Sequence, residues 1–238
     1  MGINVEELAR HIAKSDVCQP GSRARMARIT DEIYRGLHFV EMFDEIRVVT
    51  FYGSARALPE DSRYKQAYEL GALLAKDDNP IGVCTGGGPG IMEAGNKGAY
   101  DAGGYSIGLG IELPGIAESP NIYVTHRMNF YYFFARKMTL VHIAQGYVFF
   151  PGGVGTMDEF FELVTLIATK KIANHPLIIL VGRDYWEGLL LWMKTTMADT
   201  YHSVSPEIFE AFHIIDDMKQ AYTLLDTIPK RIEISDEI

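Results

Sequence analysis

The chain has 238 residues, 47% of them hydrophobic and 22% charged, which suits a globular domain with a sizeable core. Its 22 basic and 31 acidic side chains leave a net charge of −9, which disfavours general binding to nucleic acid or to anionic membranes. The two cysteines cannot form a disulfide framework, and no apolar run reaches the roughly 18 residues of a membrane span. We therefore expect a cytoplasmic protein with neither a membrane nor a nucleic acid as partner.

The first 45 residues are charged and periodic. Apolar residues recur at helical spacing over 5–14 and over 23–43, and a Gln-Pro-Gly-Ser break at 19–22 separates the two stretches. This pattern predicts two helices, which form an N-terminal helical extension over residues 1–45.

From residue 46 onward, short apolar runs alternate with amphipathic helical stretches. Strands are expected at 46–52, 81–85, 105–109, 122–125, 147–150 and 177–181, with a weaker one at 213–215. Helices are expected at 62–76, 91–102, 132–144, 156–170, 185–197 and 219–225. Such alternation is typical of βαβ units. Residues 46–238 are therefore predicted to form an α/β domain, with a mainly parallel sheet and helices on both faces.

Two of these strands end in glycine-rich loops that lead into helices, at 86–90 and at 152–155. Glycines let a ligand approach the backbone closely, and a helix N-terminus presents unpaired N–H groups, so the combination favours phosphate. The alternative is that both loops are only tight turns. Neither loop has the lysine of a P-loop, and Ile91 stands where a dinucleotide fingerprint needs glycine. A phosphate ester smaller than a dinucleotide is favoured.

The second loop continues into Thr156-Met157-Asp158-Glu159, which has the spacing of a capping box with Thr156 as N-cap. The other interpretation places Glu159 in a crevice beside the loop, where its carboxylate could bind ribose hydroxyls or stabilise positive charge at an anomeric carbon. Glu162 and Thr165 follow at steps of three on roughly the same face. The opposite face is expected to lie in the core and consists of Phe160, Leu163, Val164 and Ile167.

An aromatic run at 130–134 precedes Arg136 and Lys137. We expect part of the run to enter the core and part to meet a partner subunit, because large apolar patches mark interfaces. Arg136 offers a planar fork for a phosphate or a leaving group, and Lys137 adds a point charge. On these residues alone, a solvated pair of surface charges is the favoured interpretation.

The sequence contains no pattern typical of metal chemistry. Its seven histidines form no HExxH motif, and the two cysteines are far apart. No lysine is marked by a motif for a pyridoxal phosphate Schiff base. We expect neither a metal nor a cofactor.

Taken together, three motifs resemble the LONELY GUY family of cytokinin riboside 5′-monophosphate phosphoribohydrolases and related nucleoside-monophosphate nucleosidases, which are often mislabelled lysine decarboxylases. The most specific is Pro-Gly-Gly-Val-Gly-Thr-Met-Asp-Glu at 151–159, against the family's PGGxGTxxE. The others are Arg136-Lys137, at the family's distance upstream, and Gly-Gly-Gly-Pro-Gly-Ile-Met at 86–92. The resemblance extends from about residue 46 to 225.

The resemblance implies a Rossmann-like fold and hydrolysis of the N-glycosidic bond of a nucleoside 5′-monophosphate, giving free base and ribose 5-phosphate. It places the catalytic pair at Arg136 and Glu159. It implies no cofactor, and a homodimer or higher homo-oligomer. The substrate-binding positions that it implies are Gly53, Ser54, Gly86, Gly87, Gly88, Gly90, Met92, Glu118, Lys137, Gly152, Gly153, Gly155, Thr156, Glu162 and Thr165.

Three departures from the short plant-type members leave the base open: the N-terminal extension, Glu93-Ala94 after the first loop, and the turn at 51–56. Adenine from AMP is the first expectation, and an isoprenylated adenine from a cytokinin riboside monophosphate is the second. The alternative function is a non-catalytic nucleotide sensor or carrier, similar to molybdenum-cofactor carriers. Arg136 and Glu159 together favour the enzyme.

Overall fold

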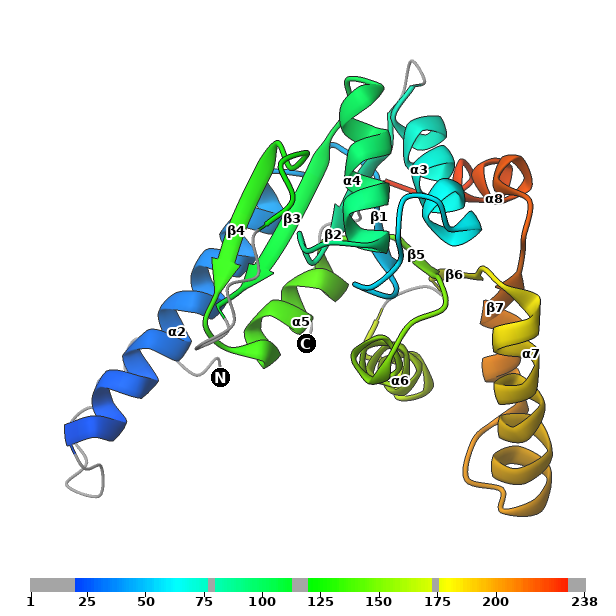
Figure 1. Cartoon of the computed structure of the whole chain (residues 1–238). Coiled ribbons are helices and arrows are strands. Elements are labelled where there is room, and N and C mark those ends of the chain that lie inside the picture. Colours follow the sequence, from blue (N-terminus) through cyan, green and yellow to red (C-terminus); the bar gives the residue numbers. More distant parts are fainter. Residues whose placement is uncertain (1–19, 77–79, 113–119, 173–175, 231–238) are drawn as a thin grey trace.

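The computed structural model describes residues 20–76, 80–112, 120–172 and 176–230. Its centre is a sheet of seven parallel strands in the order β4-β3-β2-β1-β5-β6-β7 (Figure 1). This confirms the predicted α/β fold. The strands are β1 Val48–Tyr52, β2 Gly82–Thr85, β3 Ser106–Ile111, β4 His126–Phe130, β5 Gly146–Phe149, β6 Leu177–Leu180 and β7 Phe212–Ile214. The expected helix at 5–14 lies outside the described residues.

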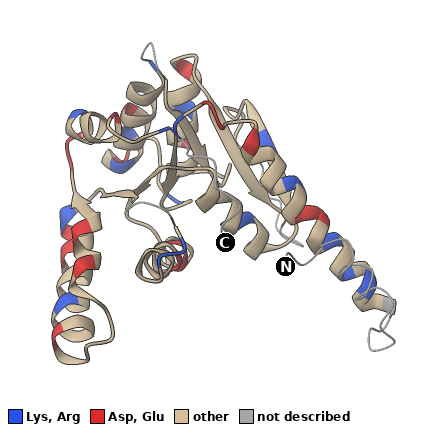
Figure 2. Ribbon diagram, turned by 180° about the vertical axis from the view of Figure 1, so that it is seen from behind, with Lys and Arg blue, Asp and Glu red and all other residues tan. Residues whose placement is uncertain are grey.

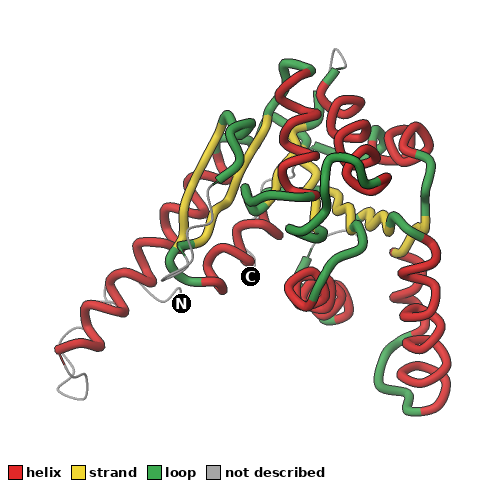
Figure 3. Tube along the Cα trace, viewed as in Figure 1, coloured by secondary structure: helices red, strands yellow, loops and turns green. Residues whose placement is uncertain are grey.

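Helices cover both faces of the sheet, as the alternation of elements predicted (Figures 1 and 3). One face packs against α3 (Ser62–Ala75), α4 (Ile91–Asp101) and α8 (Met218–Leu225). The other packs against α2 (Pro20–Glu41), α5 (Phe133–His142), α6 (Val154–Ala168), α7 (Arg183–Trp192), the π-helix η1 (Met193–Thr200) and the 3₁₀-helix η2 (Pro206–Ala211). In the described part of the chain, no helix combines the length and the apolar character that crossing a membrane requires.

The central strand β1 shows why both faces need a cover. All five of its residues are buried. Val48 and Tyr52 belong to the core cluster on the α5 side, whereas Val49 and Phe51 belong to the cluster on the α4 side. A strand that is apolar on both faces is stable only between two layers of helices. The sequence run at 46–52 therefore fits the position at the middle of the sheet.

The strand order brings the two glycine-rich loops together. β2 and β5 both pair with β1, at Thr50–Cys84 on one side and Thr50–Tyr147 on the other. Because the strands are parallel, the loops that follow β2 and β5 leave the same edge of the sheet, one on each side of β1. Ligands of open α/β sheets bind beyond the carboxyl ends of the strands, at such a switch in topology.

The fourth strand differs from its prediction. The apolar run at 122–125 predicted a strand there, but the strand is β4, four residues later, and Ile122 is 84% exposed. β4 is the edge strand and alternates half-buried and exposed residues, with only Phe130 fully buried. An edge strand tolerates polar side chains on its open face, so a search for apolar runs missed it.

The second predicted N-terminal helix is present as α2, and its C-terminal half belongs to the core. Val40 in the last turn of α2, and Phe43 just after the helix ends, pack in the cluster that contains α5. The buried carboxylate of Glu32 accepts hydrogen bonds from the N–H groups of Tyr131 (2.9 Å) and Tyr132 (3.1 Å), just before α5 begins. Charges of both signs mark the helix along its length (Figure 2). The expected domain boundary at residue 45 stays a prediction.

Candidate active site

The turn after β1 links the two glycine-rich loops through its backbone. The Ser54 N–H group donates to the Pro151 carbonyl in the second loop, at 3.2 Å, and the Ile91 N–H group donates to the Ser54 carbonyl, at 3.0 Å. Gly90, between the first loop and α4, has a φ of +71°, and a side chain there would clash with the Ser54 carbonyl oxygen. The loops therefore converge on the carboxyl end of β1.

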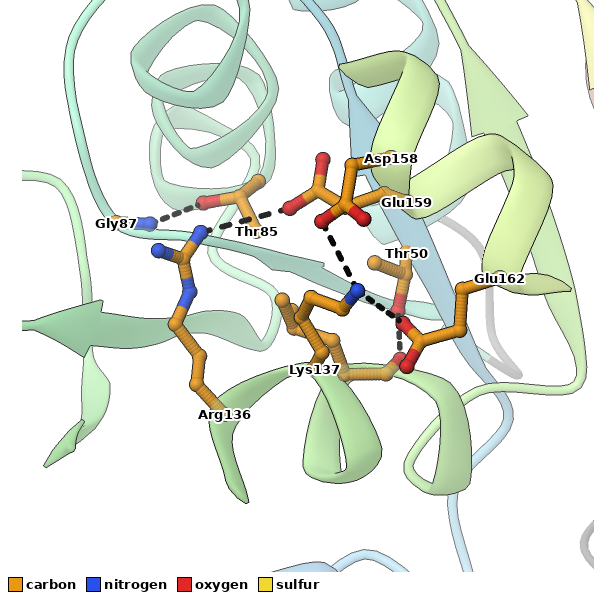
Figure 4. Close-up of polar contacts among 9 residues, drawn as sticks. Thr50, Thr85, Gly87, Arg136, Lys137, Asp158, Glu159 and Glu162 are labelled. Atoms are coloured by element: carbon orange, nitrogen blue, oxygen red, sulfur yellow. Dashed lines mark hydrogen bonds and ion pairs between the residues drawn. The ribbon is translucent and has the colours of Figure 1, made fainter. Parts of the chain in front are cut away.

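A buried polar network holds the first loop from below. The Gly87 N–H group donates to Thr85 Oγ1 at 2.9 Å (Figure 4). The Thr85 hydroxyl in turn donates to Asn96 Oδ1, at 2.5 Å. Asn121 Nδ2 donates to the Gly88 carbonyl and to Asn96 Oδ1, each at 3.0 Å. These polar side chains are buried, and each has a partner. Sequence reasoning missed them, although an asparagine on the buried face of α4 is the signal that could have found them.

The second loop opens α6 without a side-chain cap. Gly153 is the N-cap residue, and Thr156 lies inside the first turn, buried to 4% exposure. The capping-box interpretation of Thr156 is therefore wrong. Gly153, Val154 and Gly155 are exposed, with Val154 at 87%. The first-turn N–H groups thus face a side open to a ligand, which is the arrangement that binds phosphate.

Arg136 on α5 and Glu159 on α6 face each other, with Nη2 and Oε1 3.6 Å apart (Figure 4). Their side chains are only 11% and 17% exposed. Next to them, Lys137 Nζ lies 2.9 Å from Asp158 Oδ2 and 3.4 Å from Glu162 Oε2. The interpretation of Arg136 and Lys137 as solvated surface charges is wrong, because tertiary packing places α6 directly opposite them.

Hydrogen bonds to the sheet fix the position of α5. The Thr50 hydroxyl of β1 donates to the Leu140 carbonyl (3.0 Å), and the Tyr147 hydroxyl of β5 donates to the Val141 carbonyl (2.7 Å). At the other end of the helix, Glu32 holds the preceding backbone. Arg136 is therefore presented from a helix that is anchored on both sides, as a precise site requires.

The guanidinium of Arg136 extends to the first glycine loop. A Cβ atom at Gly86 would lie 2.5 Å from Arg136 Nη2 and 2.9 Å from Met92 Sδ, so the absence of a side chain at Gly86 permits this close approach. Arg136 Nε is buried and has no hydrogen-bond partner. A buried donor without a partner is costly unless a ligand completes it, so this nitrogen is a candidate contact for a ligand.

Burial raises the pKa of Glu159 to about 7, against the opposing charge of Arg136. Burial also raises the pKa of Glu162, although Lys137 opposes it. Tyr52 is buried close to this cluster, and its pKa is raised well above the usual value by burial and then by the charge of Glu159. Near neutral pH, Glu159 can therefore exchange a proton, whereas the Tyr52 phenol stays neutral.

The same end of the sheet holds a thiol. Cys84 is buried, and its pKa is raised to about 12 because burial disfavours the thiolate. It is therefore not an activated nucleophile. Over the described residues, no group of three or more His, Cys, Asp or Glu side chains is arranged to hold a metal ion.

The structure brings most of the predicted site residues to one place, around Ser54, Gly86, Met92, Arg136 and Glu159. The hydroxyl of exposed Thr165 donates to the Phe161 carbonyl of its own helix, at 2.7 Å. Glu118 lies outside the described residues. Tyr52 and Asp158 belong to the cluster and were not among the predicted positions.

The aromatic run at 130–134 is partly buried, as expected. Phe130 is fully buried, whereas Tyr131, Phe133 and Phe134 are 44–55% exposed.

The fold and the site define a Rossmann-like α/β protein with two convergent glycine-rich loops and a buried Arg–Glu pair. A sequence profile of the family described as "Possible lysine decarboxylase" matches residues 92–225, more than half of the chain. The chain belongs to this family, the LONELY GUY family that its motifs indicated.

Curated relatives match part of the chain. It is 35% identical over 153 residues to the pyrimidine/purine nucleotide 5′-monophosphate nucleosidase of Escherichia coli K12, covering 58% of this chain and 33% of that protein. It is 28% identical over 140 residues to the cytokinin riboside 5′-monophosphate phosphoribohydrolase of Rhodococcoides fascians, covering 56% of this chain and 67% of that protein. The chain thus spans only a third of the length of the Escherichia coli relative.

Solved structures support the fold. The molybdenum cofactor binding protein of Rippkaea orientalis superposes with a TM-score of 0.54 at 23% identity, over 76% of this chain and 95% of that one. The molybdenum cofactor carrier protein of Chlamydomonas reinhardtii gives 0.53 at 20% identity, over 76% and 96%. At such identities the likeness concerns the fold alone.

Proposed function

We propose that the protein hydrolyses the N-glycosidic bond of a nucleoside 5′-monophosphate and releases the free base and ribose 5-phosphate. The observation that carries this proposal is the buried Arg136–Glu159 pair beside two helix N-termini. The nucleosidase and phosphoribohydrolase names of the relatives support the same reaction.

In this reaction the 5′-phosphate lies on the open first turn of α6, at residues 152–156. The ribose then lies over Glu159, about one and a half turns along the helix. Cleavage of the bond between C1′ and the base nitrogen leaves positive charge on the ribosyl ring, which an ionised Glu159 stabilises. The charge of Arg136 favours the ionised form of Glu159 against the effect of burial, and its guanidinium donates a hydrogen bond to the departing base.

A water molecule supplies the atoms that complete the products. Its oxygen bonds to C1′, and one of its protons passes to Glu159, whose pKa of about 7 suits acceptance and return of a proton near neutral pH. The bonding electrons leave with the base, which takes up the proton that Glu159 returns, so Glu159 ends the reaction ionised as it began. No oxidant, reductant or further co-reactant is needed.

The first prediction tests the phosphate. A nucleoside 5′-monophosphate should be cleaved at least about a hundredfold faster than its nucleoside, measured as kcat/KM, because a helix N-terminus interacts far more strongly with a phosphate than with a hydroxyl. Chromatography of the base released from AMP and adenosine, and from GMP and guanosine, measures the ratio. Equal rates would contradict the phosphate site. Binding of nucleotides with no base released would favour the sensor or carrier function instead.

The remaining expectations concern assembly and location. We infer a homodimer or higher homo-oligomer, supported by the exposed aromatic side chains of Tyr131, Phe133 and Phe134 at the start of α5. A cytoplasmic location stays a prediction.

A further inference from the structure

An open hollow lies beside the first glycine loop, at the edge of the sheet formed by β3 and β4. Gly86, Gly87 and Gly88 form one wall, and the apolar side chains of Pro120, Ile111 and Val124 form others. Gly108 and Gly110 line it from β3. Arg127 on β4 is the charged residue of the lining, and the site described above does not use it.

The glycines of β3 create this space. β3 reads Ser-Ile-Gly-Leu-Gly-Ile over 106–111, so glycine occupies two of the three positions that face away from the α5 side, Gly108 and Gly110. A Cβ atom at Gly110 would lie 2.5 Å from Asn129 Oδ1 and 3.7 Å from Arg127 Nη2. Bare backbone therefore forms a flat floor, and the Arg127 guanidinium lies above it.

Asn129 orients that guanidinium. Arg127 Nε donates to Asn129 Oδ1 at 3.0 Å, and Nη2 is the Arg127 nitrogen that lies toward Gly110. The nearby carbonyls of Gly87 and Gly88 accept from the backbone and side chain of Asn121. Arg127 can offer a ligand only hydrogen-bond donors, because an arginine side chain has no acceptor.

The hollow lies at the end of a row of features along the carboxyl edge of the sheet, which begins at the proposed phosphate site. The order β5-β1-β2-β3 places in one row the phosphate-binding turn, the Ser54 turn, Gly86 and the hollow. Three inter-strand steps of about 4.8 Å make this row roughly 14 Å long. Gly86 borders both the hollow and the guanidinium of Arg136, which faces Glu159 on its other side. The hollow opens on the face of the sheet opposite α5 and α6, and Gly86 at the end of β2 connects it with the Arg136–Glu159 pair. A nucleotide with its phosphate on α6 and its ribose over Glu159 would therefore extend past Gly86, beyond the end of β2, to place its base in the hollow.

We propose that the hollow receives the base of the nucleotide and that Arg127 makes 6-oxopurines, guanine and hypoxanthine, the preferred bases. This rests on the proposed function. The hollow is partly apolar and has a floor of bare backbone, which suits a planar ring system. O6 and N7 of a 6-oxopurine are two adjacent acceptors that match the paired donors of one guanidinium, whereas adenine offers one acceptor beside the N6 donor. The two-ring base also reaches farther toward β4 than a pyrimidine does. The preference replaces adenine as the expected base.

Substitution of Arg127 tests the proposal. In the full chain, kcat/KM should be at least about tenfold higher for GMP and IMP than for AMP, since a bidentate pair discriminates between bases by about this much. Arg127→Met should lower the GMP and IMP values about tenfold and change the AMP value by less than about threefold. Arg127→Lys should lose the preference too, because a single ammonium does not match two acceptors as a fork does.

Arg183→Met is the matched control, since Arg183 is an exposed arginine on α7 that pairs with Glu187. It should leave the GMP/AMP ratio unchanged. The proposal is overturned if the wild-type protein cleaves AMP or CMP as well as GMP, or if Arg127→Met keeps the wild-type ratio. It is also overturned if Arg127→Met weakens ribose 5-phosphate binding as much as GMP binding, because Arg127 would then hold the phosphate.

The experiments distinguish failure of the proposed hydrolase function from failure of the proposed role of Arg127. If no nucleotide is cleaved, the hydrolase proposal fails. Calorimetric titration of wild-type protein and Arg127→Met with GMP and AMP then measures the preference directly. A GMP/AMP affinity ratio that is near one, or that the substitution leaves unchanged, overturns the role of Arg127.

Discussion

Two adjacent ion pairs join α5 to α6, and they differ in a way that distance alone does not reveal. Lys137 and Asp158 lie 2.9 Å apart, and the Asp158 side chain is 59% exposed. Arg136 and Glu159 are 3.6 Å apart, yet both are mostly buried. Burial works to lower the pKa of Lys137, but its hydrogen bond with Asp158 and the charge of Glu162 raise it overall. The shorter pair is satisfied within the protein, whereas the longer one retains a buried, unpartnered Nε atom.

This difference separates a structural contact from a reactive one. A pair that is short and partly solvated stabilises the packing of two helices by a modest amount. A looser buried pair retains hydrogen-bonding capacity for a ligand, and burial gives its carboxyl group a pKa of about 7. Neighbouring residues of similar charge therefore have different roles, which substitutions on α6 can separate.

The largest effect is expected for Glu159→Gln. Turnover of a nucleoside monophosphate should fall on the order of a hundredfold or more, because glutamine keeps the size of the side chain but lacks the charge that stabilises the ribosyl cation. Nucleotide binding should persist, since residues 152–156 hold the phosphate. Product chromatography and calorimetry measure the two quantities. A folded variant that binds nucleotide and turns over at the wild-type rate would exclude Glu159 as the catalytic carboxylate.

The same substitution should change the pH dependence of stability. Glu159 has its pKa raised from 4.5 to about 7 in the folded protein, so the stabilising contribution of its neutral form is complete below pH 4.5 and is lost as the pH rises through 7. Glu159→Gln cannot ionise and avoids this loss. The difference in free energy of unfolding, variant minus wild type, should therefore rise by up to about 3 kcal/mol between pH 4 and pH 8.

Urea denaturation of both proteins at several pH values measures that gain, since the other carboxyl groups cancel in the comparison. A difference between variant and wild type that is the same at acidic and alkaline pH would show that the folded state does not raise the pKa of Glu159.

The smallest effect is expected for Asp158→Asn, next to Glu159 on the same helix. Because Asp158 is largely exposed, loss of its pair with Lys137 should cost about 0.5 kcal/mol of stability. Lys137 keeps Glu162 as a partner, so turnover should stay within about threefold of the wild type. Thermal denaturation and steady-state kinetics provide the check. A loss of activity comparable to that of Glu159→Gln would mean that the two pairs act as one unit.

Local sequence patterns predicted most of the fold. β7 was expected at 213–215 and is found at Phe212–Ile214, although it is short. Helix α7 was expected at 185–197 and continues through η1 to Thr200. The edge strand β4 was misplaced because its alternation of Arg127 and Asn129 with half-buried residues is weaker than the apolar run before it. Apolar sequence patterns are strongest in strands that are buried on both faces, so the central strands are predicted best.

For the candidate site, motif spacing located Arg136, Glu159 and both glycine loops. It did not show which contacts they make. The capping box at Thr156 was a plausible local alternative, and the two cations of α5 looked solvated until α6 was placed opposite them. Asn96, Asn121 and Arg127 form part of no recognised motif, because their roles arise from contacts between segments far apart in the chain.

The sequence by itself determined the alternation of strands and helices, the two glycine-rich turns and the family, since these depend on residue type and spacing within short segments. Tertiary structure alone decided that β2 and β5 flank β1, that Arg136 faces Glu159, and that Gly108, Gly110 and Arg127 enclose a hollow. The physical reason lies in burial and long-range pairing. The pKa of a carboxyl group and the donors offered to a ligand depend on neighbours that the order of strands brings together.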